Sequence, residues 1–187
     1  GSLQRQVGEI LLAQISDEDN VTFKAVNLIN EGPLPPSTDV DKRVQFSQLN
    51  LQVSKQSKES CAFKSAAAFA RSGIELLASD KWETQYQLTL ELYSILAEME
   101  HALVNVDAAE EICREVMAQP KASIGDKFRV YSVLITIVYG KGRTDEALDL
   151  TFDVLDALNC KFPRTTAKQI PMVVREALRM KTTRKGM

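Results

Sequence analysis

Glu98 and His101 are the first residues in this chain whose types and spacing could carry chemistry. Three positions apart, they would share one face of a helix, as in the Glu-x-x-His motifs of carboxylate-bridged metal bundles. Such a centre needs a second Glu-x-x-His, and His101 is the only histidine among the 187 residues. A Ser/His/Asp or Cys/His catalytic set would need this same histidine. We therefore expect no metal site and no nucleophilic catalysis.

The run Gly-Lys-Gly-Arg-Thr at 140–144 is the second candidate, because it places glycines around a lysine. A phosphate-binding loop needs a defined glycine spacing before its lysine and a strand before the loop. Neither is present, so we interpret this run as a turn between helices. Cys61, Cys113 and Cys160 lack CxxC spacing, and we interpret them as reduced, mostly buried thiols. The sequence thus predicts no catalytic residue and no cofactor.

Three segments share a pattern of small residues followed by large apolar ones. Ala66, Ala109 and Ala147 align them at intervals of 43 and 38 residues, close to the periods of helical repeats. Each segment is typical of the second helix of a hairpin. The pattern predicts an all-α protein, a right-handed superhelix of about eight or nine tetratricopeptide-like helices. The alanines, together with Gly73, should allow neighbouring helices to approach closely.

Capping residues and apolar stripes predict where the helices begin and end. The first helix carries the stripe Leu3, Val7, Ile10 and Leu11, and a second begins near Ser16–Asp19 and ends before Pro33. Later helices are expected at about 39–55, 58–77, 80–103, from Asp107, at 123–140, at 144–159, and at 166 or 171 to 181. The caps would be Asp80, Asp107, Ser123 and Thr144. The segment 80–103 should be an inner helix, because its apolar residues cover more than one stripe.

The composition is ordinary for an ordered protein, with 44% hydrophobic and 26% charged residues. No stretch approaches the roughly 18 consecutive apolar residues of a membrane span, and the N-terminus lacks a targeting pattern. We therefore expect a cytoplasmic protein. Gly1-Ser2 is typical of a cloning scar, which leads us to expect further natural chain beyond both ends. Residues 3–160 should form the helical repeat domain.

Charge is divided unevenly along the chain. Residues 1–160 hold 15 basic and 24 acidic residues, whereas 161–187 hold 8 basic residues and Glu176 as their one acid. An acidic stripe on the helix at 144–159 would face solvent or a basic partner, and consists of Asp145, Asp149, Asp153 and Asp156. The basic tail, which includes Arg175 and Arg179, could be a solvated helix end or could dock onto an acidic face of its own or a neighbouring molecule. Nucleic acid and membrane are disfavoured, because no aromatic residue follows Phe162 and the chain is acidic overall.

The middle of the chain resembles the helical repeat region of very large signalling ATPases. The resemblance runs from about 3 to 162 and rests on the order of Asn50, Ser60, Ala62, Gly73 and Trp82, with Leu49-Asn50-Leu51, Phe63, Ala66, Phe69, Leu76-Leu77 and 88–92. In those proteins such helices follow an AAA-type nucleotide-binding module, often between kinase-like and GAF, histidine-kinase or cyclase domains. The resemblance implies a tetratricopeptide-like scaffold inside a signalling protein. It transfers no active-site residue, because this segment contains none of the catalytic parts.

The sequence therefore predicts a non-catalytic scaffold for protein–protein or interdomain contacts. Its partner would be another protein, a neighbouring domain of the same chain or a second copy. Repeat arrays bind through the exposed face of the first helices of each pair, where the candidate contacts are Gln85, Thr89, Lys127 and Arg129. The alternative is a small helical-bundle enzyme or ligand-binding protein. A closed cavity containing Glu98 and His101 would favour that alternative, and an open groove would favour the scaffold.

Overall fold

The computed structural model describes residues 2–14, 19–31, 38–121, 123–162 and 164. Within these residues it contains nine α-helices and no strand, so the expected all-α class is confirmed. The helices are α1 (Ser2–Gln14), α2 (Asp19–Asn30), α3 (Val40–Glu59), α4 (Phe63–Leu76), α5 (Lys81–Thr84), α6 (Tyr86–Ala102), α7 (Val106–Met117), α8 (Phe128–Gly140) and α9 (Thr144–Ala157). Ser16 and the segment expected to form a ninth helix after 166 lie outside the described residues.

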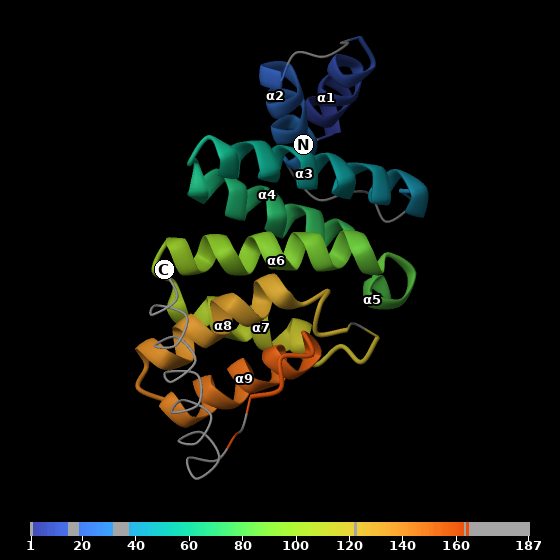
Figure 1. The fold of residues 1–187 in the computed structure, drawn as a ribbon. Helices are drawn as coiled ribbons and strands as arrows, with labels where there is room; N and C mark the ends of the chain where they lie inside the picture. Colours follow the sequence, from blue (N-terminus) through green and yellow to red (C-terminus); the bar gives the residue numbers. More distant parts are fainter. Residues whose placement is uncertain (1, 15–18, 32–37, 122, 163, 165–187) are drawn as a thin grey trace, which may run out of the picture.

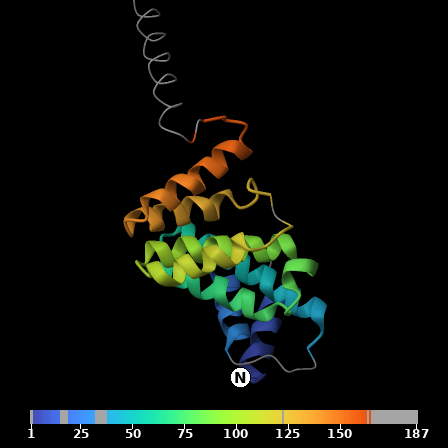
Figure 2. The ribbon, with the colours of Figure 1, turned by 90° about the horizontal axis from the view of Figure 1, so that it is seen from below.

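The helices pack as successive pairs, which Figure 1 shows stacked in chain order from α1 and α2 to α8 and α9. The pairs are α1 with α2, α3 with α4, α6 with α7, and α8 with α9. The second helix of each pair touches the first helix of the following pair. In addition, the first helix α6 touches the first helices α3 and α8. The view from below shows the same succession of layers (Figure 2). The first helices α3, α6 and α8 therefore lie side by side.

Three of the helix-joining turns are built alike. They place Cys61, Val104 and Gly142 in the left-handed backbone region, with φ of 57°, 66° and 77°. In each turn the next residue donates its N–H to the carbonyl five positions earlier, at 2.8 to 2.9 Å. This is the Schellman arrangement that satisfies the last carbonyls of a helix. The donating residue, Ala62, Asn105 or Arg143, is also the N-cap of the next helix, with φ and ψ near −83° and 61° in all three cases.

The three aligned alanines occupy the same place relative to these turns. Ala66, Ala109 and Ala147 are each the fourth residue after the N-cap, and each donates its N–H to the N-cap carbonyl. All three are buried, at 0%, 0% and 5% exposure. Their small side chains let α4, α7 and α9 lie close to their neighbours. The small-residue segments thus form the second helices of three pairs.

Gly73 is a point of close approach between three helices. A Cβ added there would lie 2.8 Å from Cδ2 of Leu92 and 3.2 Å from Cβ of Asn50, so α4 meets α6 and α3 at this glycine. The Ser47 hydroxyl donates to the Gly73 carbonyl at 2.8 Å. Asn50 is fully buried and exchanges amide hydrogen bonds with Asn30, which joins α3 to α2. The core of this region is therefore packed around one glycine and the fully buried amide of Asn50.

The expected long helix at 80–103 is two helices, because the backbone turns at Gln85, which has φ −128° and ψ 44°. Thr89 stabilises the break by placing its hydroxyl 2.8 Å from the Gln85 carbonyl and 3.1 Å from that of Lys81. The break also lets the Trp82 ring pack against Tyr93, with ring centroids 4.9 Å apart. Contacts across the turn, rather than local propensity, decide the helix boundary. The α6 part is an inner helix, with ten buried residues among its seventeen.

The expected caps differ in detail from the observed ones. Asp80 is the N-cap of the short α5 but its side chain makes no capping hydrogen bond, and α7 is capped by Asn105 rather than Asp107. Ser123 and Asp126 do exchange capping-box hydrogen bonds of 2.8 to 3.2 Å, yet α8 begins only at Phe128. The reciprocal bonds close a turn at 123–127 that precedes the helix. Thr144 is the first residue of α9, and Arg143 is its N-cap.

Candidate functional site

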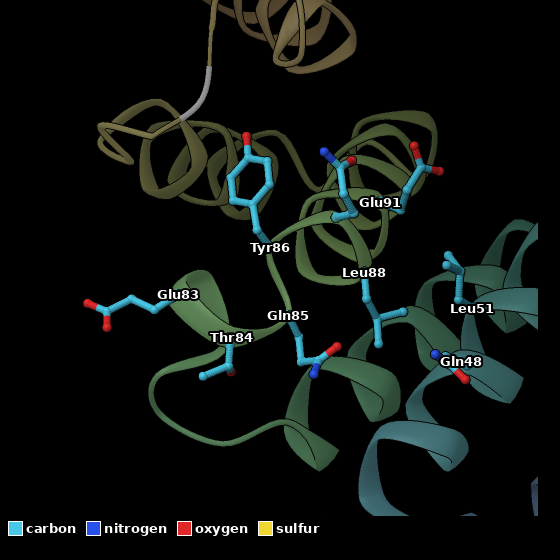
Figure 3. Close-up of a pocket in the computed structure, with 9 residues that line it drawn as sticks. Gln48, Leu51, Glu83, Thr84, Gln85, Tyr86, Leu88 and Glu91 are labelled. Atoms are coloured by element: carbon cyan, nitrogen blue, oxygen red, sulfur yellow. The ribbon is translucent and has the colours of Figure 1, made fainter. Parts of the chain in front are cut away.

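The first helices of two successive pairs enclose an open groove. This α3–α6 groove has a volume of about 560 Å³ and is shown in Figure 3. It runs from α3 across the α5–α6 turn to α6, and its lining residues are Gln48, Leu51, Glu83, Thr84, Gln85, Tyr86, Gln87, Leu88 and Glu91. The lining combines three primary amides, two carboxylates and two leucines. Amides that donate and accept at once can hydrogen bond to the backbone of an extended chain.

A chain of ion pairs borders the groove and joins α3, α6 and α8. Glu91 forms ion pairs with Lys55 at 3.0 Å and with Arg129 at 3.3 Å. Arg129 also holds Glu98 at 2.7 Å, and Lys58 reaches the same carboxylate at 2.5 Å. Burial alone would raise the pKa of Glu98, but the hydrogen bonds from Arg129 and Lys58 outweigh it and lower the pKa. The charges along these first helices are therefore largely neutralised by one another.

The four residues expected to contact a partner are placed differently from one another. Gln85 lines the groove, and Arg129 lies in the ion pairs that border it. Thr89 is fully buried. Lys127 is 6% exposed, its ammonium donates to the carbonyls of Met117 and Gln119, and burial lowers its pKa. Thr89 and Lys127 therefore hold the α5–α6 turn and the α7–α8 loop, and only Gln85 and Arg129 face the region of the groove.

Glu98 and His101 do not form a site together. Glu98 is held by cations from α3 and α8, and it lines neither the α3–α6 groove nor the two smaller hollows near Trp82 and Arg43. His101 lines none of these three hollows either. Within the described ranges, no group of three or more His, Cys, Asp or Glu side chains is arranged to hold a metal ion. Glu98 instead serves the contacts of α6 with α3 and α8.

The acidic stripe on α9 is partly covered by the chain that follows it. The Arg164 guanidinium pairs with Asp153 at 2.9 Å and with Asp156 at 2.6 Å. Asp145 and Asp149 are exposed, and among the described residues no cation pairs with them. The structure thus brings Asp153 and Asp156 together around one arginine. Arg175 and Arg179 lie outside the described residues.

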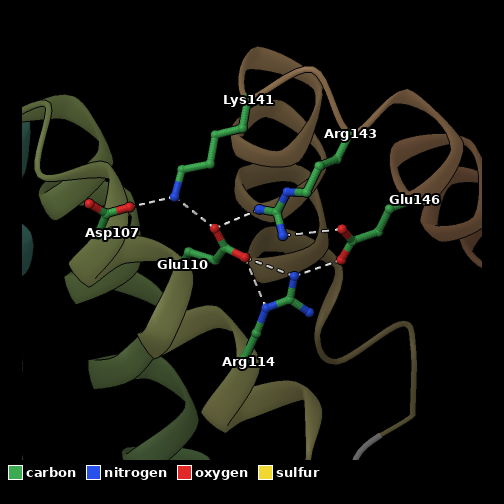
Figure 4. Close-up of polar contacts among 6 residues, drawn as sticks. All are labelled: Asp107, Glu110, Arg114, Lys141, Arg143 and Glu146. Atoms are coloured by element: carbon green, nitrogen blue, oxygen red, sulfur yellow. Dashed lines mark hydrogen bonds and ion pairs between the residues drawn. The ribbon is translucent and has the colours of Figure 1, made fainter.

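A second ion-pair cluster, which the sequence analysis did not find, joins α7 to the α8–α9 turn (Figure 4). We call it the Glu110 network; its members are Asp107, Glu110, Arg114, Lys141, Arg143 and Glu146. Glu110 accepts from Arg143 at 2.6 Å, from Arg114 at 2.8 Å and from Lys141 at 2.9 Å. The hydrogen bond from Arg143, followed by those from Lys141 and Arg114, lowers the pKa of Glu110 to about 2 against the effect of desolvation. The lysine of the Gly-Lys-Gly run therefore binds carboxylates of its own chain.

The three cysteines are free, but the expectation that they are mostly buried is wrong. Cys113 is fully buried, and burial raises the pKa of its thiol to about 12. Cys61 and Cys160 are exposed, because both lie in turns that end a helix.

Comparisons of this chain with family models, with curated proteins and with solved structures found no match. The described helices include none long and apolar enough to cross a lipid bilayer. What the protein does must therefore be inferred from its own groove and surfaces.

Proposed function

We propose that this chain is a non-catalytic helical-repeat scaffold that mediates protein–protein or interdomain contacts through the α3–α6 groove. The observation that carries the proposal is an open groove formed by the first helices of successive pairs, lined by amide and carboxylate side chains. Repeat arrays present such extended surfaces because each pair contacts only its neighbours along the stack. The proposed arrangement is a right-handed superhelix of tetratricopeptide-like hairpins.

The way the pairs follow one another supports the superhelix. The turns at Cys61, Val104 and Gly142 have the same backbone geometry, so each second helix leaves its first helix in the same direction. The aligned alanines then face the same kind of neighbour in each pair. Pairs with the same internal geometry can stack with a similar rotation at each step, and such a rotation is the origin of a superhelical stack.

The state of the ionisable groups favours binding over catalysis. A general acid or base needs a side chain whose proton can be exchanged near neutral pH. Glu98 and Arg129 hold each other ionised, because their hydrogen bond lowers the pKa of the acid and raises that of the base. What the groove offers a partner is shape, amide hydrogen bonds and the carboxylate of Glu83. The occupant we propose is an extended polypeptide, from a protein partner or a neighbouring domain.

The proposal also covers the location of the scaffold and the kind of protein that contains it. From the resemblance of Asn50, Ser60, Gly73 and Trp82 to the helical region of signalling ATPases, we propose that this scaffold is cytoplasmic and part of a larger kinase- or ATPase-type protein. Asn50 and Gly73 serve the packing of α3, α4 and α6, as expected of residues in a structural scaffold. The catalytic output would then belong to other parts of that protein.

Site-specific photo-crosslinking tests the groove. A photoreactive amino acid replaces Gln87, which is exposed and lines the groove, and in a matched control it replaces Glu111, which is exposed on α7. In cells that express the chain, we expect a discrete crosslinked partner from position 87 and none from position 111. The purified partner should then lose affinity for a Gln48→Arg, Gln87→Arg variant. Equal crosslinking from both positions, or none from position 87, would contradict the proposal.

A further inference from the structure

A hollow beside the α3–α6 groove lies between the beginning of α3, the end of α4 and the short α5. We call it the Arg43 hollow, and its volume is about 350 Å³. It shares only Thr84 and Gln85 with the groove. In Figure 3 the side chains of these two residues extend to the opposite side of the α5–α6 turn from the side chain of Tyr86. A hollow of this size is within the range of small-molecule sites, about 300–1,000 Å³.

Half of the residues that line the Arg43 hollow are apolar. Val40 and Val44 belong to the first turns of α3, whereas Leu76, Leu77 and Ala78 come from the end of α4 and the turn that follows it. Val40 is 62% exposed although its side chain is fully apolar. A ligand that places an apolar group against Val40 removes both surfaces from water, which favours the bound state.

The hollow also contains an arginine that no carboxylate neutralises. Arg43 Nε donates to the Leu76 carbonyl at 2.9 Å, which holds the guanidinium at the end of α4. Among the described residues, Arg43 forms no ion pair. Five other arginines each have a carboxylate oxygen at 2.6 to 2.7 Å, namely Arg71, Arg114, Arg129, Arg143 and Arg164. The terminal N–H groups of Arg43 can therefore bind a carboxylate that a ligand brings.

Asp80 brings the opposite charge to the same hollow. Its carboxylate makes no capping hydrogen bond to α5, and within the described part of the chain it pairs with no cation, Arg43 included. A simple cation would be attracted by Asp80 but repelled by Arg43, and a simple anion would meet the reverse. A ligand that carries both charges gains from both side chains.

We propose that the Arg43 hollow binds a free α-amino acid with an apolar side chain. The carboxylate of the ligand lies on Arg43, its ammonium group on Asp80, and its side chain against Val40. The Thr84 hydroxyl and the Gln85 amide line the same hollow and can hydrogen bond to either charged group. The site is independent of the proposed function, because Arg43 and Asp80 do not line the groove.

Amide NMR of the full chain with added amino acids tests the site. The probes are L-leucine, L-methionine and L-phenylalanine, each titrated to about 10 mM. We expect at least one of them to shift the amides of residues 38–44 and 76–85 along a saturating curve. Arg43→Gln and Asp80→Asn should each weaken binding about tenfold or more, because each removes a charge-assisted contact. Glu75→Gln should bind like the parent, since it changes an exposed acid of α4 that lines none of the three hollows.

Two blocked forms of the amino acid that binds distinguish a free amino acid from the end of a polypeptide. The N-acetyl form lacks the ammonium group and resembles a C-terminus, whereas the carboxamide form lacks the carboxylate and resembles an N-terminus. Because each form loses one of the two charges, both should bind about tenfold more weakly or worse. Equal affinity for either blocked form would overturn the proposal, because the site would then take a polypeptide end.

Three further results would overturn the proposal. One is the absence of a saturating shift with all three amino acids. Another is unchanged affinity in Asp80→Asn, which should fold normally because Asp80 is exposed and makes no capping hydrogen bond. The third is unchanged binding by Ala78→Trp, whose indole ring should occupy the hollow and leave the groove open. The amide spectrum of each variant without ligand shows whether it is folded.

Discussion

Val104 and Gly142 occupy the same position in two helix-joining turns, and both have left-handed backbone, with φ of 66° and 77°. In both turns the next residue donates to the carbonyl five positions earlier, Asn105 to Glu100 and Arg143 to Val138, each at 2.9 Å. Glycine adopts this conformation freely, whereas a β-branched residue is strained in it. The turn at Val104 is therefore strained, whereas the equivalent turn at Gly142 is not.

Exchanging these two residue types should change stability in opposite directions. Val104 is 78% exposed, so Val104→Gly loses little packing and relieves the left-handed strain, and we expect a gain of about 1 kcal/mol after the added entropy of the unfolded chain. Gly142→Val should cost about 1–2 kcal/mol, because the added side chain meets nothing within 4 Å and only the backbone is strained. Urea unfolding measures both changes. A destabilised Val104→Gly variant would show that the turns are not equivalent.

Gly73→Ala should destabilise the protein although alanine is the better helix former. A Cβ at this position would stand 2.8 Å from Cδ2 of Leu92, which is fully buried, so the side chains at the α4–α6 contact must shift. Overpacking of this kind costs about 1–3 kcal/mol, more than the 0.5–1 kcal/mol or so gained from helix propensity. The matched control is Gly140→Ala at the end of α8, where a Cβ meets nothing within 4 Å. Thermal unfolding should show a lower Tm for the first variant only.

The Glu110 network should make stability depend on pH in the acidic range. The pKa of Glu110 is lowered from 4.5 to about 2 by its cationic partners, so the folded state binds its proton less readily than the unfolded state. Its contribution is present above the unfolded pKa and is lost as the pH falls from about 5 toward 2. Solvent beside the network limits this contribution to about 1–2 kcal/mol.

Glu110→Gln tests this dependence. The variant should be less stable than the parent at pH 7, and the two should converge in stability as the pH falls from about 5 toward 2. Glu111→Gln, an exposed neighbour on the same helix, serves as the control and should match the parent throughout. Urea midpoints at a series of pH values provide the measurement. A constant difference between Glu110→Gln and the parent over the whole range would contradict the assigned ionisation.

Asn50→Ala should be strongly destabilising because it leaves polar groups of α2 and α3 without partners. Asn50 is fully buried and its amide bonds to Asn30 and to the Phe46 carbonyl. Loss of such a buried partner costs about 1–3 kcal/mol. Asn27→Ala, at an exposed position of α2, should change the free energy of unfolding by less than about 0.5 kcal/mol. Equal effects of the two variants would show that the Asn30–Asn50 amide pair does not stabilise the contact of α2 with α3.

Thiol labelling under native conditions should separate the three cysteines. Cys61 and Cys160 are exposed and should react with an aromatic disulfide reagent within the folded protein. Cys113 is fully buried and its thiol has a pKa of about 12, so it should react only after unfolding. Titration of released chromophore should therefore give two equivalents before denaturant and a third after it. Rapid release of three equivalents would contradict the packing of α7.

Much of the secondary structure is local enough to be predicted from the residues alone. Apolar stripes place the helices, and the three alanines identify α4, α7 and α9, because a helix shows one face to its neighbours every three or four residues. Helix boundaries were predicted less well. The break at Gln85 depends on Trp82 reaching Tyr93, and the turns at Cys61 and Val104 have none of the glycine that usually marks them. Contacts made elsewhere in the fold determine these positions.

The candidate site, like the secondary structure, was predicted only in part from the sequence. The sequence by itself determined an all-α chain with an acidic helix face and with only one histidine, since composition and periodicity are properties of the chain. Only the tertiary structure decided that Thr89 and Lys127 are enclosed, that Lys141 binds Glu110, and that α3 and α6 form a groove. The physical reason is distance along the chain. The Lys141–Glu110 ion pair and the two sides of the groove join residues more than thirty positions apart, and the stacking of the helix pairs decides which of them meet.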